Sequence, residues 1–431
     1  MKIAILTMFN GLTSTYSLVN VVAEHLRMFL NEGLKIKLLV SEDCNLEERY
    51  GVFLHENIEW IKITNRLNGE MIHWKDYSTP NGKIHDTFFE ETEVIAKDFI
   101  QHLEDIDICM MHDIHYQGWH LVHNIAIRKA QEQLPKVRFL AFTHSAPITR
   151  PRHTEHPFSA RYSPMPNTIY IYPTQSGIPA LSKQYNIAEG YCKVINNSLD
   201  ILECLSDDVS HVASHIDIFS ADYLIIYPGR LTTGKKFEKV AAFCGALKTK
   251  TEKEVKVIFC DFPCSDINPE RYKKMIYNNG IKFGLDREDM LFTSSIGYTQ
   301  GFPRQGVMDL FTLSNIFVCP SYSESFGLIV LEAASRGNQI VLNECVPALE
   351  ELGKQLQAYF MRWDARNFGF DTIEKYHPSE VAYLQDHASE IAKLVEGNKV
   401  LFSKAAVRRR YSPHWIWKQQ LQPLLDILPV K

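Results

Sequence analysis

Short apolar runs alternate with longer segments of helical periodicity along this chain. KIAILT at residues 2–7 is typical of a strand buried on both faces, as in a parallel sheet. After a polar turn at 10–14, apolar residues recur at helical spacing up to Gly33, and LKIKLLV at 34–40 predicts the next strand. This strand, helix, strand order predicts a doubly wound α/β domain that binds ligands at the carboxyl ends of its strands.

The same pattern continues through the first half of the chain and starts again in the second. Further strands are predicted at residues 58–63, 107–112, 137–144, 168–174, 191–200, 223–227, 255–260, 290–294, 316–321 and 339–343. Helices are predicted between most of them, and the polar interruption at 64–87 is interpreted as a hairpin or a surface excursion. No short-period repeat or low-complexity tract is present.

A change of composition after residue 199 marks the expected domain boundary. The sequence predicts a Rossmann-like domain at 1–200 and a second Rossmann-like domain at 201–410. The aromatic segment 411–431 is expected to form a helix that packs back on the first domain. Its Trp415 and Trp417 are interpreted as packing anchors rather than membrane anchors.

Composition excludes few function classes. The 431 residues are 45% hydrophobic and 23% charged, as in an ordinary folded protein, and the net charge of −5 gives no overall electrostatic case for DNA or an anionic membrane. The nine cysteines are scattered, and Cys260 and Cys264 have the wrong gap for a zinc or redox motif, so reduced, structural cysteines are expected. Without a signal peptide or an apolar run of membrane-spanning length, a cytoplasmic protein is expected.

The stretch 320–337, PSYSESFGLIVLEAASRG, has the most informative local pattern. Glu324 and Glu332 lie eight residues apart around a Phe326-Gly327 turn at which a loop is expected to become a buried helix. The N–H groups of a helix start attract anions such as phosphate, and glycine lets a ligand approach the backbone closely. Carboxylates beside an anion site accept hydrogen bonds from sugar hydroxyls, which favours a sugar nucleotide as ligand.

Cations are predicted at the end of an earlier strand. Arg230 lies just after the strand predicted at 223–227, and Lys235 follows in a loop with threonine and glycine. An arginine fork and a flexible lysine together suit a diphosphate leaving group. Alone, the two residues are equally typical of solvated surface cations.

Histidines end two strands of the first half. His112 and His144 lie where ligand sites form in such sheets. The spacing of the histidines from His112 to His123 does not fit the ligand spacing of a metal site. The long loop after His144 is locally basic. It is a candidate for acceptor contact through Arg150 and Arg152, or else a solvated surface excursion.

Together, Gly-Arg-Leu…Lys and Glu-Ser-Phe-Gly…Glu resemble the motifs of retaining glycosyltransferases of the GT-B fold, in particular the large family four that contains glycogen-synthase-like and sucrose-synthase-like enzymes (glycosyl transferases group 1). The resemblance is strongest from 223 to 350. It implies two Rossmann-like domains facing a central cleft, of which the domain at 1–200 binds the acceptor and the domain at 201–410 binds the donor. It also implies that Arg230 and Lys235 bind the donor diphosphate, that Glu324 contacts the transferred sugar and that Glu332 contacts the ribose.

Further positions follow from the same resemblance. The turn residues Phe326, Gly327 and Leu328 would contact sugar and phosphate through their backbone, and His144, in a Thr-His context, would lie near the transferred sugar. Asn10-Gly11 stands where the family commonly has Gly-Gly and is assigned with it to donor binding. The chain also departs from the family at Lys236, where glycine usually follows the phosphate-loop lysine, and at residues 197–200, Asn-Ser-Leu-Asp in place of Asn-Gly-x-Asp.

The predicted function is transfer of a sugar, with retention of configuration, from a nucleoside-diphosphate sugar to a hydroxyl of a glycan, lipid or other acceptor. His144, Arg230, Lys235 and Glu324 are the expected catalytic residues, and His112, Arg150 and Arg152 the acceptor-side candidates. No metal and no cofactor are expected besides the donor, for which a UDP-sugar is favoured.

Three other functions stay open at this point. A phage-type enzyme that glycosylates hydroxymethylated DNA bases is suggested by the basic loop at 149–161 and by Arg408-Arg409-Arg410, against the net negative charge. A sugar-nucleotide epimerase or phosphorylase would use the same fold. A degenerate sugar-nucleotide sensor is disfavoured by the intact pair of glutamates.

Overall fold

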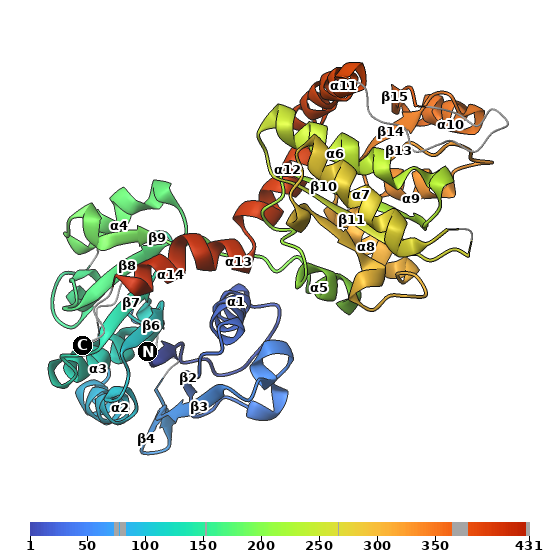
Figure 1. Cartoon of the computed structure of the whole chain (residues 1–431). Helices are drawn as coiled ribbons and strands as arrows, with labels where there is room; N and C mark the ends of the chain where they lie inside the picture. The colour runs from blue at the N-terminus through green and yellow to red at the C-terminus, as the bar shows by residue number, and fades with distance from the viewer. Residues whose placement is uncertain (73–76, 78–82, 151–152, 266, 364–377, 428–431) are drawn as a thin grey trace. The chain divides into compact units, whose positions relative to one another are not determined.

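The computed structural model describes residues 1–72, 77, 83–150, 153–265, 267–363 and 378–427. The chain divides into two compact units. Unit 1 contains Met1–Leu199 together with Pro413–Lys431, and unit 2 contains Asp200–Ser412 (Figure 1). Each unit is built around its own parallel sheet, so the predicted fold of two doubly wound α/β domains is confirmed.

Unit 1 has a seven-stranded sheet in the order β3-β2-β1-β6-β7-β8-β9, with every pair parallel. Its strands are β1 (Ile3–Leu6), β2 (Ile36–Ser41), β3 (Ile58–Ile63), β6 (Ile108–His112), β7 (Arg138–Phe142), β8 (Thr168–Tyr172) and β9 (Cys192–Val194). The strand order reverses at β1, which pairs with β2 on one side and β6 on the other. The carboxyl ends of β1 and β6 therefore mark the point where ligands bind in such folds.

Helices and two apolar clusters cover both faces of this sheet. The longer helices are α1 (Ser17–Asn31), α2 (Phe88–Leu103), α3 (Leu121–Gln133) and α4 (Ile178–Tyr185). The polar interruption contains the expected hairpin, formed by the antiparallel β4 (Arg66–Leu67) and β5 (Glu70–Met71). Residues 73–76 and 78–82 of the same segment lie outside the described part of the chain.

The C-terminal segment belongs to unit 1, although unit 2 separates it from the rest of that unit in the sequence. It consists of α13 (Pro413–Ile416), a π-helical turn at Trp417–Leu421 and α14 (Gln422–Asp426). Trp417 packs edge-on against Phe29 of α1, with 5.6 Å between ring centroids. Asn196 and Gln420 bond each other twice, through Asn196 N–H to Oε1 at 2.7 Å and Gln420 Nε2 to Oδ1 at 2.6 Å.

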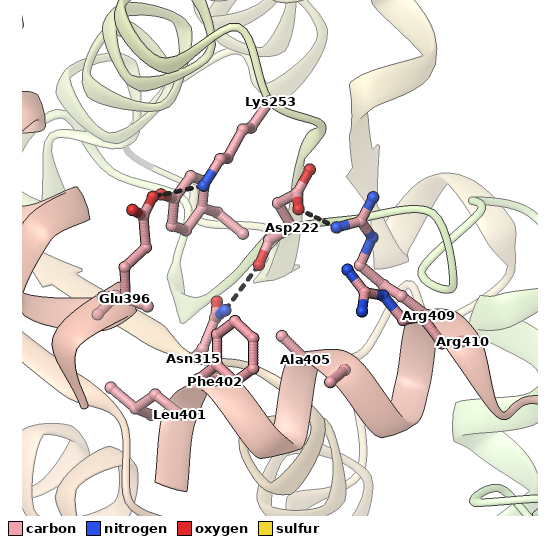
Figure 2. Close-up of a pocket in the computed structure, with 12 residues that line it drawn as sticks. Asp222, Lys253, Asn315, Glu396, Leu401, Phe402, Ala405, Arg409 and Arg410 are labelled. Atoms are coloured by element: carbon pink, nitrogen blue, oxygen red, sulfur yellow. Dashed lines mark hydrogen bonds and ion pairs between the residues drawn. The ribbon is translucent and has the colours of Figure 1, made fainter. Parts of the chain in front are cut away.

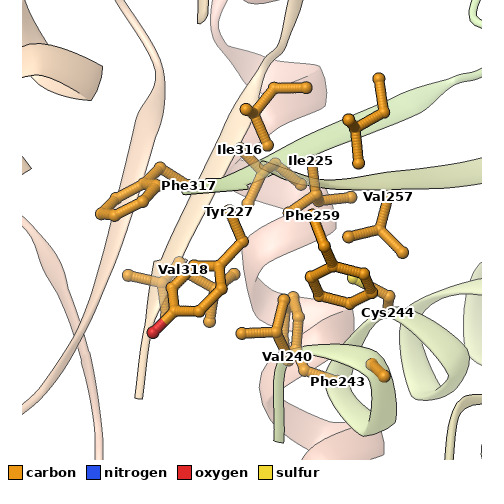
Figure 3. Close-up of a cluster of buried hydrophobic side chains, with 14 of the residues drawn as sticks. Ile225, Tyr227, Val240, Phe243, Cys244, Val257, Phe259, Ile316, Phe317 and Val318 are labelled. Carbon is orange, nitrogen blue, oxygen red and sulfur yellow. The ribbon is translucent and has the colours of Figure 1, made fainter. Parts of the chain in front are cut away.

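Unit 2 has a six-stranded parallel sheet in the order β12-β11-β10-β13-β14-β15. Its strands are β10 (Tyr223–Arg230), β11 (Val255–Phe262), β12 (Met290–Phe292), β13 (Ile316–Cys319), β14 (Gln339–Asn343) and β15 (Tyr359–Met361). The order reverses at β10, between β11 and β13, so the carboxyl ends of β10 and β13 form the second switch point. Figure 3 shows part of its core, where Tyr227 of β10 and Phe259 of β11 lie with Val240 and Phe243.

The helices of unit 2 are α5 (Asp207–Ala213), α6 (Phe237–Thr251), α7 (Pro269–Phe283), α8 (Arg304–Leu313), α9 (Leu328–Ser335), α10 (Pro347–Leu356), α11 (Pro378–Gly397) and α12 (Lys399–Arg410). Strand β10 runs three residues beyond the predicted end because Pro228, Gly229 and Arg230 continue the register with β11. Proline is compatible with this part of β10, since the pairing with β13 lies earlier, at Ile225. Among the described residues, no helix has both the length and the apolar character needed to cross a bilayer.

Candidate active site

The turn before α9 requires glycine. Gly327 has φ +92°, in the left-handed region, and a Cβ at this position would lie 3.1 Å from Leu349 Cδ2 and 3.3 Å from Val330 Cγ2. Because glycine has neither the steric cost of that φ nor a Cβ, helix α9 starts at the next residue, beside the end of β13. Its first-turn N–H groups give this end of the sheet a partial positive charge.

Lys235 and Glu324 form an ion pair between Nζ and Oε1. Lys235 lies in the short 3-10 turn Thr233–Lys235 after β10, and Glu324 in the loop after β13. Tyr322 N–H donates to Gly234 O at 2.9 Å, which joins the two loops through the backbone as well. The folding of unit 2 therefore brings together two predicted donor-site residues that lie 89 positions apart in the sequence.

Arg230 adds a second cation at this switch point. It is the last residue of β10 and is exposed, and its guanidinium has no ion-pair partner among the residues that the structure describes. Arg230, Lys235 and the start of α9 are thus three sources of positive charge at the carboxyl ends of β10 and β13. Such groups suit a diphosphate, and the carboxylate of Glu324 can accept hydrogen bonds from sugar hydroxyls.

Glu332 lies on α9, one turn into the helix, with only 13% of its side chain exposed. Its Oε1 accepts hydrogen bonds from Arg304 of α8, at 2.7 Å from Nη2 and 3.1 Å from Nε. The ribose contact predicted for Glu332 thus requires a carboxylate that an arginine already holds in place. Phe326 and Leu328 have more than half of their side chains exposed, in accordance with the expectation that their backbone carries the contact.

Lys236 departs from the family at a position where the backbone favours glycine. Its φ is +56°, and it precedes the first residue of α6. A side chain in this left-handed conformation costs about 1–2 kcal/mol. Lys236 Nζ lies 4.8 Å from the centre of the Tyr322 ring, a cation–π contact that offsets part of that cost.

Unit 1 has a pocket of about 700 Å³ at its own switch point, along the ends of β1, β6 and β7. It brings together three predicted site residues, Asn10, Gly11 and His144. Its lining consists of Thr7, Met8, Phe9, Asn10, Gly11, Leu12, Thr13, Tyr16, Ser17, Leu18, Glu48, Asp113, Gln117, Trp119, His120, His144 and Ser145.

His144 is held by a stack of buried rings. Its Nε2 lies 2.9 Å from Nδ1 of His112, whose ring also stacks on Phe142 with 4.9 Å between centroids. Burial lowers the pKa of His144 to about 4 and that of His112 well below the ordinary value. Both imidazoles are therefore neutral near pH 7, so one donates the shared hydrogen bond and the other accepts it.

Asp113 lines the pocket next to this stack, and sequence analysis did not include it among the site residues. Its φ is +61°, and its Oδ1 accepts the backbone N–H of His144 at 2.9 Å. Burial raises the pKa of Asp113 to about 6. Tyr16 and Trp119 also line the pocket and were not predicted. The signal for Asp113 was its position directly after a predicted strand, beside His112.

One acceptor-side candidate, His112, needs a correction, and one arginine of the basic loop is buried. His112 is fully buried, so it contacts His144 and not an acceptor. Arg161, the last arginine of the basic loop, is buried as well: Nε donates to Tyr116 O at 2.7 Å, and the guanidinium lies over the rings of Tyr116 and Tyr162. Arg150 is exposed, and Arg152 lies outside the described residues.

The run Arg408-Arg409-Arg410 is not a free basic patch. Arg408 is fully buried and donates from Nη2 to Ala221 O at 2.6 Å and from Nη1 to Leu313 O. Arg409 pairs with Asp222, as Figure 2 shows, and only Arg410 is exposed. The adjoining pocket, between Lys253, Glu396 and Phe402, measures about 70 Å³ and is too small for a sugar nucleotide.

The histidines that follow β6, His115, His120 and His123, make contacts within unit 1. His115 Nε2 lies 2.9 Å from Thr143 Oγ1, and Nδ1 of His120 lies 3.4 Å from Nδ1 of His123. Within the part of the chain that the structure describes, no three His, Cys, Asp or Glu residues form a group that could hold a metal ion. The cysteines are all present as free thiols.

Comparison with known proteins gives one family match. Residues 215–360 match the family model Glycosyl transferases group 1. This range contains Arg230, Lys235, Glu324 and Glu332, so the resemblance to glycosyl transferases group 1 is confirmed for the greater part of unit 2, whereas membership of family four and retention of configuration stay predictions. No curated protein matches the chain.

Solved structures are similar over nearly the whole chain at low identity. They include a glycosyltransferase from Rickettsia africae, with 14% identity, 100% of both chains covered and a TM-score of 0.37. HepE from Anabaena in complex with UDP and glucose has 14% identity, covers 99% of this chain and 100% of its own, and has a TM-score of 0.37. Sucrose-phosphate synthase from Thermosynechococcus elongatus has 12% identity, covers 99% of each chain and has a TM-score of 0.37.

Proposed function

We propose that this protein is a glycosyltransferase that moves a sugar from a nucleoside-diphosphate sugar to a hydroxyl acceptor. The observation that carries the proposal is the Lys235–Glu324 ion pair beside the start of α9, inside the stretch that matches Glycosyl transferases group 1. This arrangement offers cations for a diphosphate and a carboxylate for sugar hydroxyls at one strand switch point. A UDP-sugar is the favoured donor.

The proposed reaction begins with departure of the nucleoside diphosphate from the anomeric carbon. Negative charge then grows on the phosphate oxygen, where Arg230, Lys235 and the N–H groups of α9 stabilise it. One well-placed donor of this kind contributes about 2.7–4 kcal/mol to lowering a barrier. Since these groups already supply positive charge, we propose that the transfer needs no divalent cation.

Retention of configuration is proposed through displacement on the front face of the sugar. The acceptor hydroxyl forms the new bond on the face from which the diphosphate leaves, and its proton passes to the departing phosphate oxygen. Glu324 is tied to Lys235, which suits a carboxylate that positions sugar hydroxyls better than one that attacks carbon. His144, neutral because burial lowers its pKa, would donate or accept a hydrogen bond near the transferred sugar.

Incubation of the full chain with UDP-, ADP- and GDP-sugars tests this proposal. We expect one donor to release its nucleoside diphosphate at a rate that EDTA does not change. NMR of the product should show the anomeric configuration of the donor. Folded protein that turns over none of the donors would contradict the proposal, and a product of inverted configuration would contradict the retaining mechanism.

Two alternatives make different predictions. An epimerase would convert the donor without transfer, and a phosphorylase would form a sugar 1-phosphate from inorganic phosphate.

The DNA-modifying function has lost part of its support. Arg408 and Arg409 bind partners within unit 2, and Arg161 binds a carbonyl within unit 1.

A further inference from the structure

We propose that the pocket of unit 1 binds an uncharged, hydroxyl-rich acceptor, such as a neutral saccharide, and discriminates against phosphorylated sugars and nucleic acid. This inference rests on the proposed function, since it names the class of acceptor for the same reaction. The pocket lies at the switch point of unit 1 and includes His144. Its volume of about 700 Å³ is that of a small-molecule site.

The charge of the lining argues against an anionic ligand. None of the described residues that line the pocket is lysine or arginine. Glu48 and Asp113 are the acidic residues of the lining, and His144 is neutral near pH 7 because burial lowers its pKa. His120, the other histidine of the lining, lies with its Nδ1 3.4 Å from Nδ1 of His123. A phosphate group would lose its hydration here without gaining a lysine or arginine in return.

A cationic ligand is not favoured either, because both carboxylates already have partners. Glu48 Oε1 accepts from Asn45 Nδ2 at 3.0 Å, and Asp113 Oδ1 accepts the backbone N–H of His144 at 2.9 Å.

Asn10 supplies the polar contact that a hydroxyl-rich ligand needs. Both its amide oxygen and its amide nitrogen are buried and have no hydrogen-bond partner among the described residues. Buried amides are almost always paired in folded proteins, so an unpaired one that lines a pocket indicates a missing ligand or water. An amide offers a donor and an acceptor side by side, as neighbouring sugar hydroxyls require. We therefore assign Asn10 to this ligand instead of the donor.

Two exposed aromatic rings contribute to the apolar part of the pocket. Tyr16 is 49% exposed and Trp119 is 44% exposed, although both line a concave site. The ring of Tyr16 is supported edge-on by the buried Phe9, with 6.3 Å between centroids. Exposed aromatic faces of this kind pack against the C–H face of a pyranose, and the few polar groups beside them orient it.

Binding to the full chain, measured without donor by calorimetry or saturation-transfer NMR, tests the inference. The probes are methyl glucoside and maltose as uncharged sugars, glucose 6-phosphate as the anionic one and glucosamine as the cationic one. We expect the uncharged sugars to bind at least tenfold more tightly than glucose 6-phosphate and glucosamine. Equal or tighter binding of either charged sugar would overturn the inference.

Variants locate the binding site. Trp119→Ala and Tyr16→Ala should each weaken binding of the uncharged sugar about tenfold or more, whereas Trp119→Phe, which keeps an aromatic face, should bind nearly as the parent does. Tyr191→Ala is the matched control, because Tyr191 is a 61% exposed aromatic residue of unit 1 outside the pocket lining. Unchanged binding in both alanine variants of the pocket would overturn the inference.

A charge reversal gives an independent test. Glu48→Lys places a cation in the lining and should strengthen binding of glucose 6-phosphate relative to methyl glucoside. An unchanged preference would contradict the electrostatic argument. Slow release of nucleoside diphosphate from the donor alone separates the two proposals: if it occurs while uncharged sugars fail to bind, the acceptor class is wrong and the transferase function stands.

Discussion

Lys235 Nζ and Glu324 Oε1 contact each other directly in unit 2, across the two loops that follow β10 and β13. The two residues belong to different sequence motifs, and each neutralises the other before a donor binds. A nucleoside-diphosphate sugar would draw Lys235 toward phosphate and leave the carboxylate of Glu324 to sugar hydroxyls. The ion pair thus connects the residue proposed to bind phosphate, Lys235, with the residue proposed to contact the sugar, Glu324, although the two lie in separate motifs.

Lys235→Ala should lower the rate of nucleoside diphosphate release about 10²–10³-fold, since it removes one group that stabilises the leaving phosphate. The measurement is steady-state release from the active donor. Lys253→Ala is the control, because Lys253 also forms an ion pair in unit 2, with Glu396, away from this switch point. Equal loss in the two variants would mean that the effect comes from folding and not from the site.

Gly327→Ala should destabilise unit 2 more than Gly337→Ala. Both glycines have positive φ, +92° and +71°, so both substitutions carry the cost of a left-handed alanine. Only Gly327 adds a close contact, 3.1 Å from the new Cβ to Leu349 Cδ2, whereas nothing lies within 4 Å at Gly337. The difference between the two variants in the free energy of unfolding, measured in urea, should be about 1–3 kcal/mol. Equal losses would contradict the packing argument.

Lys236→Gly should leave the protein about 1 kcal/mol more stable than Lys236→Ala, because both lose the contact with Tyr322 but only glycine is free of the cost of positive φ. Thermal unfolding of both variants measures this difference. If alanine is as stable as glycine, the backbone at this position is not strained. The departure from the family would then need another explanation.

Arg408→Ala should cost several kcal/mol of stability, because it leaves the carbonyls of Leu313 and Ala221 without their buried donor. Arg410→Ala, at an exposed position of the same run, should change stability by less than about 0.5 kcal/mol. Urea unfolding of the two variants is the measurement. Comparable, small effects would restore the arginine run as a surface feature.

The stability of unit 1 should fall as the pH drops from about 6.5 toward 4. Burial lowers the pKa of His25 and His115 to about 3, of His144 to about 4 and of His112 well below its ordinary value. In this range the unfolded chain, whose histidines titrate near about 6.5, binds more protons than the folded one. Asp113 acts in the opposite sense, because its raised pKa gives stability that is present at low pH and lost as the pH rises through about 6.

Four histidines outweigh one aspartate, so the net slope is set by the histidines. Thermal unfolding followed by circular dichroism from pH 7.5 to 4.5 measures it. His25→Phe keeps a ring against His112 and Phe142 but removes one proton site, and should make the dependence on pH shallower. A slope unchanged by this substitution would contradict the assignment.

The sequence predicted the sheets well because their strands are buried on both faces and thus read as unbroken apolar runs. It also singled out Lys235 and Glu324, because each lies in a short motif, and the fold brings the two side chains into contact. Their roles toward a donor stay predictions. It did not predict Arg304 as the partner of Glu332, because that contact joins two helices and leaves no local trace. Tyr16 and Trp119 were missed for the same reason: only the fold brings them to one pocket.

The arginine run shows a different limit. Three consecutive arginines suggested contact with DNA, and that interpretation is wrong for Arg408, which is buried. The helical spacing indicates the burial of Arg408, because this residue follows the buried Leu401 by two helical turns on the same face of α12. At this position, helical periodicity predicts burial better than residue charge predicts exposure.

The return of the C-terminal segment to unit 1 affects how the chain can be made. Unit 1 is encoded in two pieces, with all of unit 2 between them, whereas unit 2 is one continuous stretch. During synthesis, unit 2 is complete before Trp417 and Gln420 exist to pack against Phe29 and Asn196. The domain whose translation starts first is therefore finished only after unit 2, and its apolar surface on α1 stays uncovered until residues 413–426 have been synthesised.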